Sequence, residues 1–283
     1  MVMFLLVFFG GLLAWIVGPE SEFLAEPNRI GVIEIKGIIS DVQENLKAFK
    51  QYRKDENIKA ILLRIDSPGG AVGPSQELYR EVRRTIEKKP VVASLGATAA
   101  SGGYYIASAA TRIFSNPGTI TGSIGVIIHF PNLQSLFDKI GYTMVTIKSG
   151  QFKDIGNPNR EMTSEEKQLM QGTIDEAYRQ FVQDVARGRN LSEEKVREVA
   201  DGRILLGQTA HELGLVDEIG NFQDAVDAAA KLGKIEGEPE VIFFKKKRHS
   251  LLDFLVGNDV SEQLSALLDG SGSFLKYQLP VFP

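Results

Sequence analysis

The 283-residue chain has no cysteine, one tryptophan and three histidines. The absence of cysteine excludes a cysteine nucleophile, a disulfide framework and thiolate metal sites. It leaves the compartment open, because a cysteine-free chain survives oxidising and reducing surroundings alike. Any histidine base must be His129, His211 or His249. There is also little net charge, −4, so we expect no nucleic-acid partner.

The first 18 residues carry no charged side chain. A helix of that length spans ~27 Å, close to the hydrocarbon thickness of a bilayer. Trp15 lies near its end, where interfacial aromatic residues are enriched. A cleavable signal peptide is the alternative, but neither a basic leader nor a small-x-small cleavage site is clear. We predict an uncleaved transmembrane anchor at 1–18, in contact with lipid, and a linker at 19–29.

Beyond the linker, β-branched runs alternate with amphipathic segments. We expect strands at 30–39, 59–67 and 90–96, and helices at 41–58 and 74–89. This order predicts right-handed crossovers and a mostly parallel sheet. Ligands bind at the carboxyl ends of such strands. The two glycine-rich turns, "DSPGGA" and "ATAASGG", both follow strands and should therefore lie at the same sheet edge.

The remainder of the chain is predicted in less detail. Further β structure is expected at 112–127, a strand leading into a loop at 143–156, and helices at 163–189 and 192–202. The long helix has a capping signal at Thr163 or Ser164. The composition changes after about residue 233. We therefore divide the chain into a domain at 30–233 and a C-terminal extension at 234–283.

Ser101 lies where the third expected strand gives way to a helix. The N–H groups at a helix start are unpaired, and the positive end of the helix dipole favours developing negative charge there. Gly102 and Gly103 permit a tight turn. Ser101 can therefore be a nucleophile whose oxyanion is held by the amides of Gly102 and of Gly69 or Gly70. The same pattern also suits a simple helix cap, or a phosphate or CoA site.

A serine hydroxyl is a poor nucleophile without a base. His129 lies in an apolar segment where a structural role is the commoner one, His211 falls on a surface helix, and His249 is in a basic tail. The other route is a lysine kept neutral by burial. Lys148 and Lys153 flank a glycine loop, and either can point into a cleft.

Five sequence blocks occur together in the order and spacing of one known family. They are "RIDSPGG", "AASGGYYIA", "TGSIGVI", "IKSGQFKDIGNPNREMT" and "ADGRILLGQTAHELGLVDEIG". Over about residues 30 to 232 the chain resembles the short bacterial form of the signal peptide peptidase A family. These are membrane-anchored serine peptidases of the Clp–crotonase superfamily. The resemblance implies an α/β fold of repeated ββα units with a mostly parallel sheet.

The resemblance also implies roles for particular residues. Ser101 and Lys153 correspond to the family's Ser–Lys dyad, and Ser123 to the serine that holds the lysine amine. Gly70 and Gly102 correspond to the oxyanion donors. No metal or cofactor is implied, and His129 has no counterpart role.

The family takes peptides in extended form, which implies that the substrate adds to the sheet as a strand. The residues expected to bind it are Ala71, Val72, Thr121, Gly122 and Ile124. Remnant signal peptides or other extended apolar peptides are the implied substrates. Family members form ring-shaped homo-oligomers in which neighbours complete the site. The catalytic domain is expected outside the cytoplasmic membrane.

Two other functions remain open on the sequence. A crotonase-like acyl-CoA enzyme shares the fold and the paired oxyanion amides, although it usually places acidic residues at the chemistry and has no membrane span. A catalytically silent membrane scaffold would also keep the fold. A fluorophosphonate that labels Ser101 would separate the peptidase from the CoA enzyme, which lacks that nucleophile. The presence of both Ser101 and Lys153 argues against the scaffold.

Overall fold

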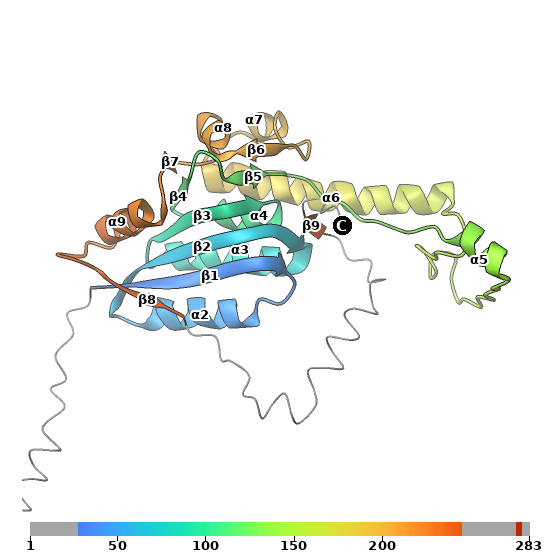
Figure 1. The fold of residues 1–283 in the computed structure, drawn as a ribbon, viewed down its shortest axis with the longest axis horizontal. Coiled ribbons are helices and arrows are strands. Elements are labelled where there is room, and N and C mark those ends of the chain that lie inside the picture. Colours follow the sequence, from blue (N-terminus) through green and yellow to red (C-terminus); the bar gives the residue numbers. More distant parts are fainter. Residues whose placement is uncertain (1–27, 245–275, 279–283) are drawn as a thin grey trace, which may run out of the picture.

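The computed structural model describes residues 28–244 and 276–278, which build one nine-stranded α/β sheet (Figure 1). The order begins β1 (Arg29–Ile39), α2 (Gln43–Lys54), β2 (Ile58–Ala71), α3 (Val72–Ile86), β3 (Val91–Ala100) and α4 (Gly102–Ala107). The three strands pair in parallel with β2 in the centre, which confirms the predicted mostly parallel sheet.

The later elements extend this sheet and add a long helix. They are β4 (Arg112–Ser115), β5 (Ile120–Gly122), α5 (Gln134–Ile140), α6 (Ser164–Arg189), α7 (Glu193–Arg197), β6 (Ile204–Leu206), α8 (Gly207–Glu212), β7 (Glu218–Ile219), α9 (Phe222–Leu232), β8 (Glu240–Phe243) and β9 (Lys276–Gln278). Among the described pairings, β5–β6 and β2–β9 are the antiparallel ones. Two of these strands, β8 and β9, come from the expected extension at 234–283 and join the main sheet.

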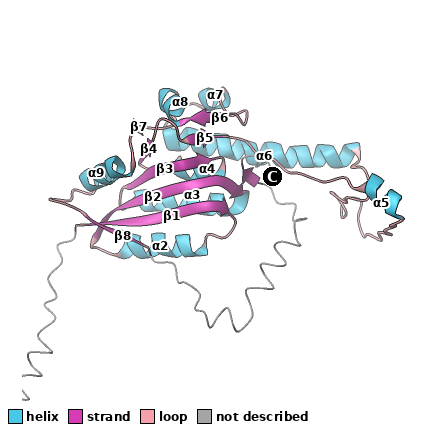
Figure 2. Cartoon of the chain, viewed as in Figure 1, coloured by secondary structure: helices cyan, strands magenta, loops and turns pink. Residues whose placement is uncertain are grey.

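Helices cover the two faces of the sheet unequally (Figure 2). The main core lies between β1–β3 and the layer of α2, α3 and α4, with the C-terminal half of α6 packed beside it. Its largest fully buried side chains include Tyr104, Tyr105, Phe49 and Phe181. A smaller core on the opposite face lies under α9, around Val226 and Ala229.

The glycine-rich turns are part of strands. β2 runs on through Pro68, Gly69 and Gly70 to Ala71, and β3 runs on to Ala100, whereas we expected strands ending at 67 and 96. Backbone pairing continues across both segments. The register of the β2–β3 pair shifts between Ile65 and Ser67, and that of the β1–β2 pair shifts between Lys36 and Ile38. The predicted ββα repeat is therefore seen as one long strand per unit with a register shift inside it. The two turns do lie at one sheet edge, as predicted.

Part of α6 extends away from the sheet, together with α5 and the loops between them (Figure 1). The buried apolar residues of α6 begin at Ala177. We call residues 126–175 the arm. Within 143–156 the predicted strand is wrong, whereas the predicted loop is present as bends and turns at 149–156. The segment lies on the arm, where it has no neighbouring strand in the described chain, and Val145 and Ile147 are 82% and 96% exposed. The capping signal is confirmed, since Thr163 and Glu166 form a capping box.

The predicted anchor at 1–18 and the linker up to residue 27 fall outside the described residues, and Arg29, which we assigned to the linker, already belongs to β1 because it pairs with Ile58 of β2. Within the residues that are described, no helix combines the length and the apolarity needed to cross a bilayer.

A pair of glycines in α6 tests the packing of this helix on α4. A Cβ at Gly188 would lie 2.1 Å from the Ser108 carbonyl oxygen, whereas Gly172 has open space. We expect Gly188→Ala to lower the free energy of unfolding by roughly 1–3 kcal/mol through overpacking. Gly172→Ala should raise it by up to about 1 kcal/mol, because alanine has the higher helix propensity. Denaturant unfolding measures both, and equal effects would contradict the close approach.

Candidate active site

Ser101 lies in a strained turn between β3 and α4. Its backbone angles are φ 52° and ψ −117°, a region that non-glycine residues rarely adopt. The turn is held by hydrogen bonds from the Ser101 N–H to the Gly122 carbonyl and from the Tyr105 N–H to the Ser101 carbonyl, both 2.8 Å. A serine on a sharp strand-to-helix turn is a recurring geometry for nucleophiles.

The Ser101 hydroxyl takes no part in the hydrogen bonding of the described fold. The residue is 1% exposed, and its Oγ has no hydrogen-bond partner among the described residues. It makes no side-chain cap to α4, so the helix-cap interpretation is wrong. A buried hydroxyl without a partner costs free energy, and native structures usually satisfy such groups. This makes Ser101 the strongest single indication of a site.

The predicted oxyanion glycines lie at the same edge. Ser67 of β2 pairs with Ala99 of β3, and a Cβ at Gly103 would come within 3.0 Å of the Ser67 carbonyl oxygen. A Cβ at Gly70 would lie 2.1 Å from the Ile39 carbonyl oxygen. Packing against β1 thus requires glycine at 70 whatever its catalytic role. The roles of Gly70 and Gly102 as oxyanion donors stay predictions. The pairing of β2 with β3 brings both glycine-rich segments to the sheet edge where Ser101 lies.

Ser123 is brought beside Ser101 by strand pairing. Ala100 pairs with Gly122, which places Ser101 and Ser123 at the ends of neighbouring strands. Ser123 also has a positive φ of 52°, and its N–H donates to the Arg203 carbonyl at 2.8 Å. The sequence indicated Ser123 through a motif, and the sheet supplies the proximity.

The predicted substrate residues divide into two groups. Both edges of β5 are already paired, with β3 and β6, so Thr121 and Gly122 present no free strand edge in the described chain. Thr121 and Ile124 are fully buried.

At the end of β2, the backbone accepts an added strand. The pairing is antiparallel to β9, with Gly69 opposite Gln278, Gly70 opposite Tyr277 and Ala71 opposite Lys276. Ala71 therefore lies at an edge where an extended segment does bind, whereas Val72 is the first residue of α3 and lies just beyond that pairing.

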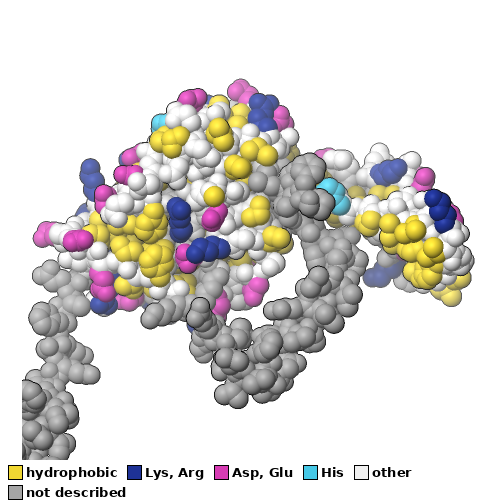
Figure 3. Space-filling model, viewed as in Figure 1, with side chains coloured by type: hydrophobic (Ala, Val, Ile, Leu, Met, Phe, Trp, Pro, Cys, Tyr) yellow, Lys and Arg dark blue, Asp and Glu magenta, His cyan; other side chains and the backbone are white. Residues whose placement is uncertain are grey.

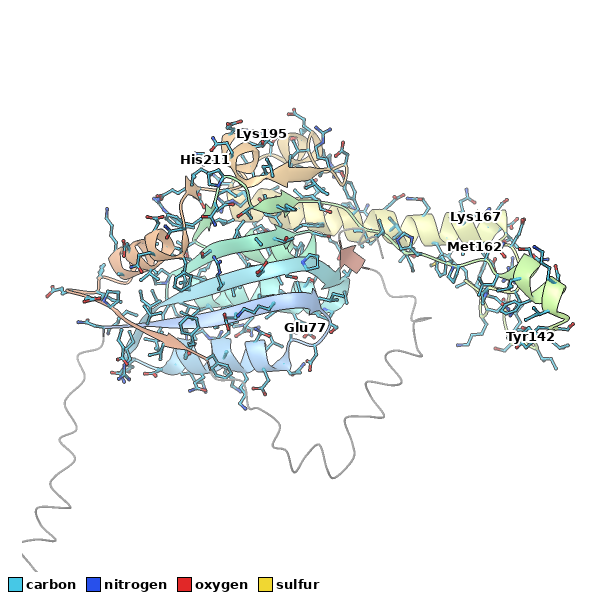
Figure 4. All side chains as sticks on the ribbon, in the orientation of Figure 1. Glu77, Tyr142, Met162, Lys167, Lys195 and His211 are labelled. Carbon is cyan, nitrogen blue, oxygen red and sulfur yellow. The ribbon has the colours of Figure 1, made fainter. Side chains whose placement is uncertain are left out.

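Lys153 lies on the arm, exposed, and is not brought to Ser101 within this chain. Tyr142 and Met162, which bracket it in sequence, are far out on the arm in Figure 4. The separation follows from α6. Glu166, in the first turn of α6, accepts a hydrogen bond from Arg160, close to Lys153 in sequence, and Asp184 accepts one from Tyr105 of α4. The two acidic residues are 18 residues apart, which corresponds to ~27 Å of helix. Sequence order alone could not reveal this spacing.

A charge network surrounds the lysine loop. Lys148 Nζ donates to Asp154 Oδ1 at 2.5 Å and to the Gln151 carbonyl at 2.9 Å. Arg160 bridges Asp154 and Glu166. Hydrogen bonds from Arg160 hold the pKa of Asp154 well below its usual range and lower the pKa of Glu166 to about 2.

The network separates the two candidate lysines. Lys148 is committed to an ion pair, whereas the Lys153 amine has neither a hydrogen bond nor an ion pair within the described residues. Our sequence reasoning missed the network. Its signal was available, since Lys148, Asp154, Arg160 and Glu166 alternate in charge at intervals of six residues.

The histidines show no catalytic arrangement in the part of the chain described. His129 is exposed on the arm, and His211 Nδ1 lies 3.2 Å from the Val216 carbonyl oxygen. His249 is outside the described residues. Among the residues that are described, no three His, Asp or Glu side chains come together as a metal site requires.

Comparison with known proteins identifies the family. The sequence model of Peptidase family S49 matches residues 83–236, which include Ser101, Ser123 and Lys153. The chain belongs to this family. It is 45% identical over 246 residues to "Putative protease slr0021" of Synechocystis sp., covering 86% of this chain and 88% of the relative.

Other relatives agree. "Putative signal peptide peptidase SppA" of Enterococcus faecium is 37% identical, with 84% of this chain and 73% of the relative covered. "Serine protease SPPA, chloroplastic" of Arabidopsis thaliana is 34% identical over 84% of this chain and 36% of its own length. The resemblance to signal peptide peptidase A is confirmed, and the family assigns the chain to the serine peptidases.

The strained turn allows a test independent of activity. At φ 52° glycine is favoured and alanine strained, so Ser101→Gly should be more stable than Ser101→Ala by about 1 kcal/mol. Ser94, a buried residue of regular β3, is the control. There the order should reverse by about 0.5–1 kcal/mol, because glycine weakens a strand. Denaturant unfolding measures the four variants, and the same order at both positions would refute the strain.

Proposed function

We propose that this protein is a serine endopeptidase that cleaves extended peptides with Ser101 and Lys153 supplied by neighbouring subunits of a homo-oligomer. The observation that carries the proposal is the buried, unpartnered Ser101 hydroxyl in a strained turn at the glycine-rich sheet edge. The family supports a serine peptidase, and the position of Lys153 on the arm supports contribution from a neighbour.

The mechanism is acyl transfer. The neutral amine of Lys153 takes the proton from the Ser101 hydroxyl, and the alkoxide attacks the peptide carbonyl. The amides of Gly70 and Gly102 hold the resulting oxyanion. The protonated amine then gives its proton to the leaving amine, and water activated by the same lysine releases the acyl-enzyme. Ser123 holds the amine in place.

A neighbouring subunit could cover the apolar surface that the arm leaves exposed. The exposed apolar residues of the arm are Leu133, Leu136, Ile140, Tyr142, Met144, Val145, Ile147 and Phe152. Figure 3 shows an apolar patch at the far end of the arm. Contiguous apolar surface of this kind marks an association site. Contact with a second copy would bury the patch and desolvate Lys153, and desolvation is what favours the neutral amine.

The end of β2 supports extended peptides as the substrate class. The chain's own β9 pairs there, residue for residue, across Gly69, Gly70 and Ala71. A substrate strand in the same position would bring its carbonyl groups to the Gly70 amide. Backbone pairing supplies affinity that is independent of side chains.

The cellular setting rests on the sequence and the relatives. We propose remnant signal peptides as a substrate, because the Enterococcus faecium relative is named a signal peptide peptidase. We also propose that residues 1–18 anchor the enzyme in the cell membrane with the catalytic domain on the extracytoplasmic side.

Mixing two inactive variants tests the shared dyad. Ser101→Ala and Lys153→Ala, carrying different tags, are co-expressed and purified through both tags. If neighbours share the dyad, about a quarter of the sites in randomly mixed oligomers combine an intact serine with an intact lysine. Peptide hydrolysis should therefore return to about that fraction of the wild-type rate, with Ser101 labelled by a fluorophosphonate.

The controls separate the possible failures. Each variant alone must be inactive, and full activity of Lys153→Ala would refute the dyad itself. Inactive mixtures that still co-purify would show that serine and lysine act within one chain.

Removing residues 276–283 tests the peptide-binding edge. Because β9 pairs with Gly69–Ala71, it competes with a substrate for the same edge. We expect its removal to lower KM for an extended peptide roughly 3- to 10-fold with kcat unchanged, as expected when an occluded fraction is released. Steady-state kinetics measure this. An unchanged KM would place the substrate elsewhere.

A further inference from the structure

The loop that carries Lys153 is closed by side chains of its neighbours. Successive turns are formed by backbone hydrogen bonds from Lys153 to Gly150, Ile155 to Phe152 and Asn157 to Asp154. Asp154, the residue after the lysine, receives Lys148 from one side and Arg160 from the other. The lysine itself therefore extends from a turn whose two flanks are pinned.

Arg160 links this turn to the first turn of α6. Its Nε and Nη2 donate to the two Asp154 oxygens at 3.1 and 3.0 Å. Its Nη1 and Nη2 donate to the two Glu166 oxygens at 2.7 and 2.5 Å. Glu166 is 2% exposed and completes the capping box with Thr163. One planar guanidinium thus makes bidentate contacts with two carboxylates, a geometry that lysine cannot reproduce.

The linkage continues through α6 into the body of the protein. The C-terminal half of the helix is buried at Phe181, Val182 and Val185. Asp184 accepts hydrogen bonds from Tyr105 of α4 and from Tyr79 of α3. A chain of direct contacts therefore runs from the loop of Lys153 to the helix that follows Ser101.

We propose that Arg160 is a positioning residue for Lys153, acting through Asp154 and Glu166. The proposal rests on the proposed Ser101–Lys153 dyad. Most of the exposed loop has little packing to hold it, so ion pairs must fix the direction from which the lysine leaves the arm. General-base catalysis is sensitive to this direction, since small misplacements of a reacting group slow the chemistry steeply.

The test is steady-state kinetics of full-length Arg160→Ala and Arg160→Lys. We expect kcat to fall about 10²-fold in both while KM changes less than about 2-fold, because the peptide edge is untouched. Glu166→Gln should also lower kcat, and the double variant should lose no more than Arg160→Ala alone, since the residues act as a unit. Arg179→Ala is the control, an exposed arginine of α6 paired with Glu176, and should keep the wild-type rate.

Chemical rescue separates positioning from a general folding defect. Arg160 borders an open cavity of about 390 Å³, so a small cation can enter when its side chain is removed. Methylguanidinium should restore part of the kcat of Arg160→Ala, whereas methylammonium should not, because only the former spans both carboxylates. Oligomeric state by light scattering should remain that of the wild type.

The outcomes are distinguishable from failure of the proposed function. If Lys153→Ala is inactive and Arg160→Ala keeps the wild-type kcat, the positioning role is refuted and the dyad stands. If Lys153→Ala is fully active, the dyad is refuted and the role of Arg160 falls with it. If Arg160→Ala lowers activity only by dissociating the oligomer, with no rescue by methylguanidinium, Arg160 serves assembly and not positioning.

Discussion

Asp184 is the junction on which the arrangement of the site depends. Tyr105, four residues after the candidate nucleophile, donates to its carboxylate, and Tyr79 donates to its carbonyl at 2.9 Å. Burial raises the pKa of Tyr79 to about 12, so its hydroxyl remains a donor at any physiological pH. The ring of Tyr105 packs against those of Tyr79 and Phe181, with a centroid separation of 4.9 Å in each pair. These contacts fix the direction of α6, and with it the position of the arm.

A fixed helix has a chemical consequence. One end of α6 packs on α4, the helix that follows the buried Ser101, and the other holds the exposed loop of Lys153. Neither half has what the proposed reaction needs. The serine has a preformed turn without a base, and the lysine has a braced loop without the dry surroundings that favour its neutral form. In the proposed function, association of two copies would join the halves, and an isolated chain would be inactive before assembly.

The glycines at the sheet edge show how structure and chemistry share residues. Gly70 is required because Ile39 of β1 approaches too closely for any side chain. The same bare backbone leaves an amide that can face a ligand, and the chain's own β9 pairs beside it. A glycine in such a motif is therefore, by itself, weak evidence of a catalytic role. The unpartnered hydroxyl of Ser101 is stronger, because packing gives no reason for it.

The sequence by itself determined the features that depend on neighbours along the chain. Alternating strands and helices specified the parallel sheet, Thr163 and Glu166 began α6, and the glycine-rich blocks marked the edge around Ser101. Only the tertiary structure decided that 143–156 lacks a strand, since a strand requires a partner from elsewhere. It also gave the physical difference between Lys148 and Lys153, which the sequence separated only through the family resemblance, because Asp154 pairs with the first. It also separated Ser101 from Lys153, since a rigid helix sets a distance that spacing in a sequence does not encode.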